Sequence, residues 1–250
     1  MSAPVTRRLR SAAGPVLQVI AIGAAGFLVG LALSLLAFET LRFAGIPLED
    51  RPTLVIIISV VMLQGVGFGS VGLGYLYYSR AGFDLLHVSW PGLRELIWFV
   101  AGLVGLFVAL IAFNLLLLAL GIETAQHELV DLGLENPELL LVLIPLSILL
   151  VGPGEELLFR GVIQELLRER FSAFVAIGIA SVLFAVAHVG ALAGEGILPT
   201  LVVYFVLSVL LGLVYEYSRN LVVPALIHGV FNAIQFSLLY VVAVYDMVPQ

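Results

Sequence analysis

Seven long apolar segments constrain the fold of this 250-residue chain more than any other feature. A helix needs about 20 predominantly apolar residues to cross the hydrocarbon core of a bilayer. Membrane-spanning helices are predicted at residues 15–38, 53–78, 95–120, about 138–167, 172–190, 197–217 and 221–245. We therefore expect an all-α polytopic membrane bundle of seven to eight transmembrane helices, folded as one integral membrane domain over residues 1–250.

The composition agrees with a membrane protein and excludes several other classes. Hydrophobic residues make up 62% of the chain, whereas charged residues make up only 11%. This balance excludes a soluble globular enzyme and a disordered chain. The absence of cysteine excludes disulfides, thiolate metal sites and thiol nucleophiles. The acidic balance, 17 acidic against 11 basic residues, argues against a nucleic-acid partner.

Arginines indicate the orientation of the chain in the membrane. If the N-terminus is inside, the outer loops carry only Arg42 and Arg51, and the loop at residues 122–138 is acidic. The inner segments then carry Arg7, Arg8, Arg10, Arg80, Arg94, Arg168, Arg170 and Arg219. The positive-inside rule thus predicts a multi-pass protein of the cell membrane with a cytoplasmic N-terminus.

Gly67, Gly69 and Gly72 spell the G-x-G-x-x-G pattern of dinucleotide-binding sites. That fingerprint requires a preceding strand and an aqueous setting, whereas these glycines lie inside a predicted span. Glycines three and four residues apart let membrane helices approach closely. We therefore interpret the pattern as a helix-packing feature.

The fourth span carries the strongest functional signal. Its purely apolar part, residues 139–151, is too short to cross a bilayer, so the helix must continue through Glu155, Glu156 and Arg160. Charged residues within a span face the protein interior or a wet cavity and are functional candidates. Pro153 is expected to kink this helix and to free carbonyl groups, which would make space for water.

Spacing separates the roles of the two glutamates. Glu156 and Arg160 are four residues apart and share a helix face, so we expect them to form an ion pair. Glu155 has no charged partner on its own helix. This unpaired carboxylate is therefore the better candidate for catalysis.

The four histidines fall into two groups. His87 and His127 lie in predicted loops and are expected to be solvated. His188 and His228 lie within predicted spans. Asn232 is one turn after His228 on the same helix face, so the two polar side chains lie side by side.

A depth count allows these groups to converge. Glu155 is 15 residues before the turn near Arg170, and His188 is 18 residues after that turn. On an antiparallel helix pair the two side chains therefore lie at comparable depth. Helix tilt can absorb the remaining offset of His228 and Asn232 on the last span.

Two kinds of hydrolytic chemistry suit this set. Two imidazoles and a carboxylate form a common catalytic zinc site, which makes His188, His228 and Glu155 tentative Zn²⁺ ligands. Alternatively, Glu155 is a general base for water without a metal, and His228 and Asn232 hold the oxyanion. Both routes hydrolyse an acyl bond within the membrane.

Three motifs resemble those of a known family. Glu155 to Arg160 matches E-E-x-x-x-R, Phe184 to His188 matches F-x-x-x-H, and His228 to Asn232 matches H-x-x-x-N. Their order and spacing resemble the CaaX-protease and bacteriocin-processing (CPBP or Abi) family, which includes the Ras-converting CaaX endopeptidase. The motif-bearing core spans about 138–245.

The resemblance implies an intramembrane protease of the glutamate or metallo type. Glu155 resembles the family's water-activating glutamate, Glu156 and Arg160 complete the first motif, and His188, His228 and Asn232 resemble the other catalytic positions. The expected partners are the lipid bilayer and a membrane-associated or lipid-anchored protein or peptide.

Two other functions remain open. The first is a non-catalytic membrane protein that binds a peptide, as in bacteriocin immunity, and its function would survive Glu155→Gln. The second is a proton-coupled transporter, which inverted repeats and paired broken helices would support. The chain shows one Gly-Pro-Gly break and no second one.

Overall fold

The computed structural model describes residues 3–79 and 82–245, with the backbone alone for residues 3–12. Arg80 and the side chains of Arg7, Arg8 and Arg10, on which part of the orientation argument rests, lie outside this description. The elements are α1 (Ala3–Phe43), α2 (Pro52–Val60), η1 (Val61–Phe68), α3 (Gly69–Tyr78), η2 (Gly82–Leu85), α4 (Leu93–Ala119), β1 (Gln126–His127), α5 (Glu128–Glu135), α6 (Pro137–Leu146), η3 (Ser147–Val151), α7 (Gly152–Glu156), η4 (Leu157–Gln164), α8 (Glu165–Arg168), α9 (Ala173–Ala187), η5 (Val189–Ala191), β2 (Leu192–Ala193), α10 (Ile197–Ser218) and α11 (Val222–Val244).

Seven helical segments of the described chain are long and apolar enough to cross a membrane. They are Ala13–Phe43, Pro52–Tyr78, Leu93–Ala119, Pro137–Arg168, Ala173–Ala191, Ile197–Ser218 and Val222–Val244. This confirms the all-α polytopic fold, and the segment ends lie within a few residues of those predicted from hydropathy, except for the longer first segment.

The second and fourth spans are composite helices. α2 continues through the π-helix η1 into α3, and α6 continues through the π-helices η3 and η4, which flank α7. Pro153 lies at the start of α7, directly after η3. The helix runs on through Pro153, and the π-helical turns on both sides of α7 were not predicted from the sequence.

Glycines let the backbone of α7 contact two neighbouring helices. A Cβ atom on Gly152 would collide with the carbonyl oxygen of Ala225 in α11, and one on Gly154 would collide with that of Gln64 in η1. The segment α7, which contains Glu155 and Glu156, therefore packs between η1 and α11 with its backbone in direct contact with theirs.

Gly67 confirms the packing interpretation of the G-x-G-x-x-G pattern. A Cβ atom there would lie 2.6 Å from the Cα atom of Gly30, so this glycine is where η1 crosses α1. Gly72 faces the side chain of Leu157, whereas a Cβ on Gly69 would meet nothing within 4 Å. Only part of the pattern is needed for packing.

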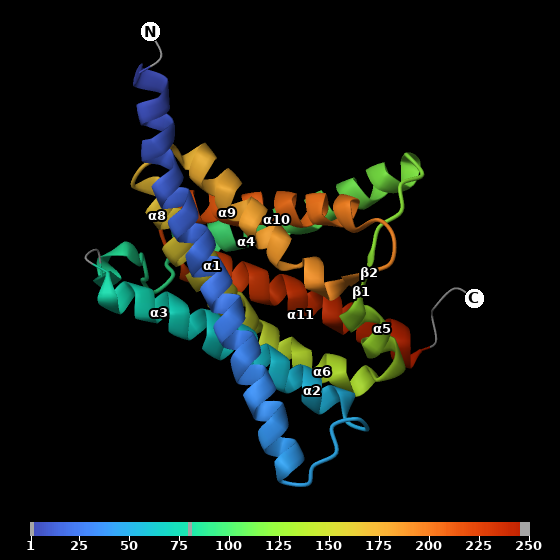
Figure 1. Ribbon diagram of the computed structural model, residues 1–250. Coiled ribbons are helices and arrows are strands. Elements are labelled where there is room, and N and C mark those ends of the chain that lie inside the picture. The colour runs from blue at the N-terminus through green and yellow to red at the C-terminus, as the bar shows by residue number, and fades with distance from the viewer. Residues whose placement is uncertain (1–2, 80–81, 246–250) are drawn as a thin grey trace.

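The helices enclose three apolar clusters. The first joins α1, η1, α3, η4, α8 and α9; the second joins α4, α10 and α11; and the third joins α2, α6 and α11. Figure 1 shows α11 running through the middle of the bundle, with α10 and α4 on one side and α6 and α2 on the other. Many large apolar side chains on the outside remain exposed, as expected for a surface in contact with lipid.

The acidic connection at residues 122–138 is ordered by local pairing. β1 pairs with β2 in antiparallel register, with Gln126 opposite Ala193, and α5 follows as a surface helix. Ala125 donates its N–H to the hydroxyl of Thr200, which fastens the connection to α10. The hydropathy pattern does not predict this strand pair, of which β2 follows directly after η5, the turn that begins next to His188.

Candidate functional site

The predicted ion pair of the fourth span is present. Arg160 Nη1 donates to Glu156 Oε1 at 3.1 Å, and both side chains are almost wholly buried. His228 Nδ1 contacts the same oxygen at 2.9 Å from α11. Glu156 therefore links its own helix to the helix that carries the third motif.

Arg160 is held by groups on two further helices. Its Nη2 donates to both the carbonyl oxygen and the hydroxyl of Ser208 in α10, at 2.9 and 2.8 Å. Its guanidinium carbon lies 4.9 Å from the centre of the Phe184 ring in α9. These contacts compensate a charge that is 1% exposed.

The unpaired glutamate lies between the two span histidines. Glu155 Oε2 is 3.9 Å from His188 Nε2 and 4.0 Å from His228 Nε2. This oxygen is buried and has no hydrogen-bond partner within the described chain. The structure thus brings Glu155, His188 and His228 together from three helices, as the depth count allowed.

Both imidazoles are oriented through Nδ1. His188 Nδ1 lies 2.8 Å from the carbonyl oxygen of Phe184, which can only accept, so this nitrogen carries the proton. Glu156 Oε1 likewise accepts from His228 Nδ1. In each ring Nε2 is the nitrogen that faces Glu155, and the side chain of His188 is 23% exposed against 5% for Glu155.

Phe184 explains why the second motif contains an aromatic residue. Its ring packs against His188 at 4.6 Å and against His228 at 5.8 Å between ring centres. The guanidinium group of Arg160 lies over the face of the same ring. The motif therefore supplies both the imidazole and the aromatic surface that shapes its surroundings.

Asn232 is placed less closely by the structure. It is half-buried on α11, one helical turn after His228 and on the same face. No hydrogen bond of its amide to the described side chains is observed. Its proximity to the carboxylate of Glu155 therefore rests on the helix face it shares with His228.

The residue types and the spacing of the tentative zinc ligands point in different directions. His188, His228 and Glu155 are suitable ligands by type, and their Nδ1 partners resemble those of zinc-bound histidines. Ligand atoms of a tetrahedral zinc lie about 3.4 Å apart, which is shorter than the separations seen here. No group of three or more His, Asp or Glu side chains in the described part of the chain has the arrangement of a metal site.

The loop histidines are less solvated than the sequence suggested. His127 is half-buried and accepts the N–H of Leu129 on Nδ1, where it caps α5. Burial lowers the pKa of His127 to about 4, and nearby His188 acts in the same direction. His87 accepts from Arg219 at 2.8 Å and joins a polar network at the far end of the bundle.

Tyr204 is a neighbour of the site that lies outside the three motifs. Its ring packs edge-on against His188, with 5.1 Å between ring centres. A signal for it exists in the sequence, because Tyr204 precedes Ser208 by one turn on α10. This spacing becomes informative only once the hydrogen bond from Arg160 to Ser208 is known.

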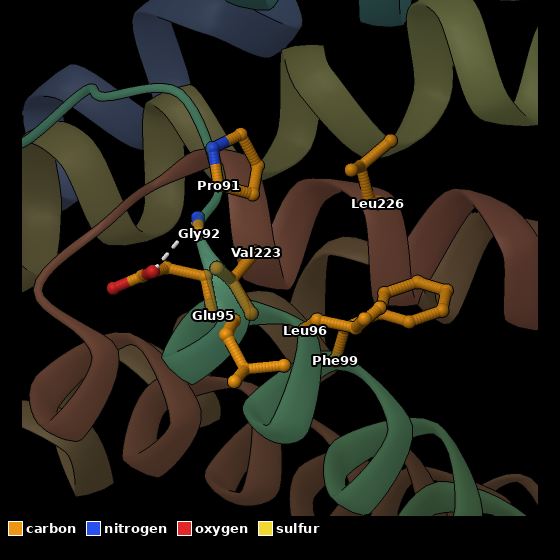
Figure 2. A pocket seen from close by; sticks show the side chains of 8 residues that line it. Pro91, Gly92, Glu95, Leu96, Phe99, Val223 and Leu226 are labelled. Carbon is orange, nitrogen blue, oxygen red and sulfur yellow. Dashed lines mark hydrogen bonds between the residues drawn. The ribbon is translucent and has the colours of Figure 1, made fainter.

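Figure 2 shows an open cleft beside the start of α4. It has a volume of about 540 Å³ and is lined by the start of α4 and by Val223 and Leu226 of α11. Glu95 accepts the N–H of Gly92 at its edge, which caps α4. None of the candidate site residues lines this cleft.

Comparison with known families agrees with the motifs. Residues 137–234 match the family described as "Type II CAAX prenyl endopeptidase Rce1-like", and this segment contains every candidate site residue named above. The chain is related to the CPBP family of CAAX proteases. The match covers less than half of the chain. Comparisons with curated proteins and with solved structures found no significant match.

The CPBP relationship implies a protease that acts on membrane-associated peptides within a bilayer. The seven spans make the chain a multi-pass membrane protein. Within the match, His188 Nε2 and His228 Nε2 lie 3.9 and 4.0 Å from Glu155 Oε2.

Proposed function

We propose that this protein is an intramembrane endopeptidase whose catalytic residues are Glu155, His188, His228 and Asn232. It hydrolyses a peptide bond of a membrane-associated or lipid-anchored protein or peptide, with a water molecule activated by Glu155. The observation that carries the proposal is the buried Glu155 Oε2, which lacks a hydrogen-bond partner in the described chain and faces two imidazole Nε2 atoms.

The separations of 3.9 and 4.0 Å between Glu155 Oε2 and the two imidazole Nε2 atoms suit a water molecule held between them. Two hydrogen-bonded atoms bridged by one water lie roughly 4–5 Å apart, beyond direct hydrogen-bond distance. Such a water donates one hydrogen to Glu155 Oε2 and the other to His188 Nε2. Its oxygen then carries the electron pair that attacks the scissile carbonyl carbon.

The proton path follows from these positions. Glu155 takes a proton as the water oxygen bonds to the carbonyl carbon, and a tetrahedral oxyanion forms. Asn232 and the charged form of His228, whose Nδ1 is held by Glu156, donate hydrogen bonds to that oxyanion. Glu155 then returns the proton to the leaving nitrogen as the peptide bond breaks, which yields a carboxylic acid and an amine, and the acid ionises once it is released.

Glu156 and Arg160 serve as positioning residues in this scheme. Glu156 orients His228 through Nδ1, and Arg160 holds Glu156 against α10 through Ser208. Neither group needs to contact the substrate.

The test uses the full chain in lipid nanodiscs with a farnesylated peptide that ends in a CaaX sequence. Cleavage in H₂¹⁸O should place one ¹⁸O atom in the new carboxylate, as read by mass spectrometry. Glu155→Gln should lower the rate by about 10²–10⁴-fold, because it removes the base but keeps the shape of the side chain. The exposed Glu138→Gln, on the same continuous helix, is the matched control and should keep the wild-type rate.

The other outcomes separate the competing functions. Wild-type cleavage that survives Glu155→Gln would refute the proposed mechanism. Peptide binding without cleavage by any variant would favour the binding or immunity function.

Zinc analysis of the same preparation, made without a His-tag, distinguishes the two hydrolytic routes. The proposed mechanism predicts cleavage in a preparation without bound zinc. Near-stoichiometric zinc that both His188→Ala and His228→Ala abolish would instead establish a metalloprotease.

A further inference from the structure

One face of α10 is directed at the site helices. Thr200, Tyr204, Ser208 and Gly212 follow one another at four-residue intervals, so their side chains share this face. Thr200, Ser208 and Gly212 are all buried. Two of them have polar side chains, and the third, a glycine, has no side chain to cover its backbone polar groups. A polar stripe that is buried in a membrane bundle must have partners.

Three members of the stripe have partners on neighbouring segments. Thr200 accepts the N–H of Ala125, and Ser208 accepts Arg160 Nη2 on its carbonyl oxygen and hydroxyl. The carbonyl oxygen of Gly212 accepts Gln164 Nε2 at 3.2 Å. These hydrogen bonds therefore hold α10 against the connection at residues 122–138 at one end, and against the composite helix of Glu155 further along.

Tyr204 is the exception in this stripe. Its half-buried ring packs edge-on against His188, yet its hydroxyl has no hydrogen-bond partner within the described chain. The hydroxyl oxygen of Tyr204 keeps some accessible surface, unlike the unpaired carboxylate oxygen of Glu155. A free phenolic donor beside the most exposed imidazole of the site is therefore available to a ligand.

We propose that the Tyr204 hydroxyl donates a hydrogen bond to a backbone carbonyl oxygen of the bound peptide, beside His188. This assignment rests on the proposed function. It adds a substrate-binding residue from α10, a helix from which none of the three motifs draws a residue.

A peptide backbone is the ligand that fits this donor. An extended peptide that enters a membrane-embedded site carries carbonyl groups that have lost their water, so each needs a donor from the protein. The phenol is neutral, so it satisfies a carbonyl without adding charge to a site that already holds two glutamates and an arginine. The oxyanion donors come from α11, and Tyr204 lies across His188 on α10, which places it next to a flanking carbonyl of the peptide.

Tyr204→Phe tests the hydroxyl while it retains the ring that packs on His188. The affinity for the fluorescent farnesylated CaaX peptide is measured in nanodiscs in a Glu155→Gln background, which leaves the peptide uncut. Loss of one neutral hydrogen bond should weaken binding about three- to tenfold. Tyr240→Phe, on the distant part of α11 and also half-buried, should leave the affinity unchanged.

A series of ester analogues identifies the carbonyl that accepts. Replacing the amide that contains this carbonyl by an ester weakens the acceptor, so Tyr204→Phe should then have no further effect. The effect should persist for the other ester positions. A purely structural role of Tyr204 would give the same loss with every analogue.

Binding and cleavage report separately on the two proposals. Equal affinity of the Tyr204→Phe and Tyr240→Phe variants, or a loss that no ester analogue removes, would overturn the assignment of Tyr204. The proposed function would stand or fall on wild-type cleavage alone. A wild-type protein that binds the peptide without cutting it would refute the function and leave the Tyr204 measurement readable.

Discussion

Glu156 Oε1 receives hydrogen bonds from two different helices, from Arg160 four residues along its own chain and from His228 in α11. Arg160 in turn reaches Ser208 of α10. At the residue scale, this buried network fixes the orientation of the His228 imidazole, whose Nε2 faces Glu155. Removing one charged partner of a buried pair leaves the other charge uncompensated, which costs more than the pair itself contributes.

Arg160→Met is therefore expected to destabilise the fold by about 3–5 kcal/mol, because it leaves Glu156 buried without its cation. Unfolding by a denaturing detergent measures the change. The double variant Glu156→Gln, Arg160→Met should recover much of the stability, since no charge then remains unpaired. Arg42→Ala, which breaks the exposed pair with Glu39, should change stability by less than about 1 kcal/mol. Equal effects at the buried and exposed arginines would contradict this account.

At the element scale, the helix that carries both glutamates depends on close backbone contacts. π-helices flank α7 on both sides, and η1 approaches it from the second span. π-helical segments are rare and are often found at functional sites. Here they surround Glu155 and Glu156, and Gly152 and Gly154 permit the contacts with α11 and η1.

Gly154→Ala is expected to destabilise the protein by about 1–3 kcal/mol, because the added methyl group would overlap the carbonyl oxygen of Gln64. The same substitution should also reduce peptide cleavage, since it displaces the residue before Glu155. Gly74→Ala is the matched control, because nothing lies within 4 Å of its Cβ and alanine favours the helix. A thermal shift assay in detergent compares the two, and a Gly154→Ala protein as stable as wild type would refute the close contact.

At the scale of the whole molecule, charge is distributed unevenly between the two ends of the bundle. Arg94, Arg168 and Arg219 lie at the end where α4 and α11 begin, whereas the acidic connection with β1 and α5 lies at the other end. The positive-inside rule predicts that the arginine-rich end is cytoplasmic. His188, near the end of its span, lies toward the acidic end.

Because the chain contains no cysteine, single cysteines can report this orientation without background. A membrane-impermeant maleimide should label Glu123→Cys in intact cells, and should label Glu169→Cys only after permeabilisation. Both glutamates are exposed, so the two sites are matched in residue type and accessibility. The reverse labelling pattern would show that the N-terminus lies outside.

Local sequence patterns determined much of this protein. Span positions follow from hydropathy, because each helix in a bilayer must satisfy its own backbone and present an apolar exterior. The pairing of Glu156 with Arg160 follows from helical periodicity, which places residues four apart on one face. The motifs also identified Glu155, His188 and His228, because polar residues within a membrane span are candidates for function.

Only the tertiary structure decided how these residues meet, because separations within a helix say nothing about contacts between helices. It showed that His228 bonds to Glu156 through one nitrogen and faces Glu155 with the other. It placed π-helical turns on both sides of α7, where the backbone contacts η1 and α11, and residue spacing within one helix does not predict such turns. It also brought Tyr204 onto His188, a contact set by the crossing of α9 and α10 rather than by either sequence.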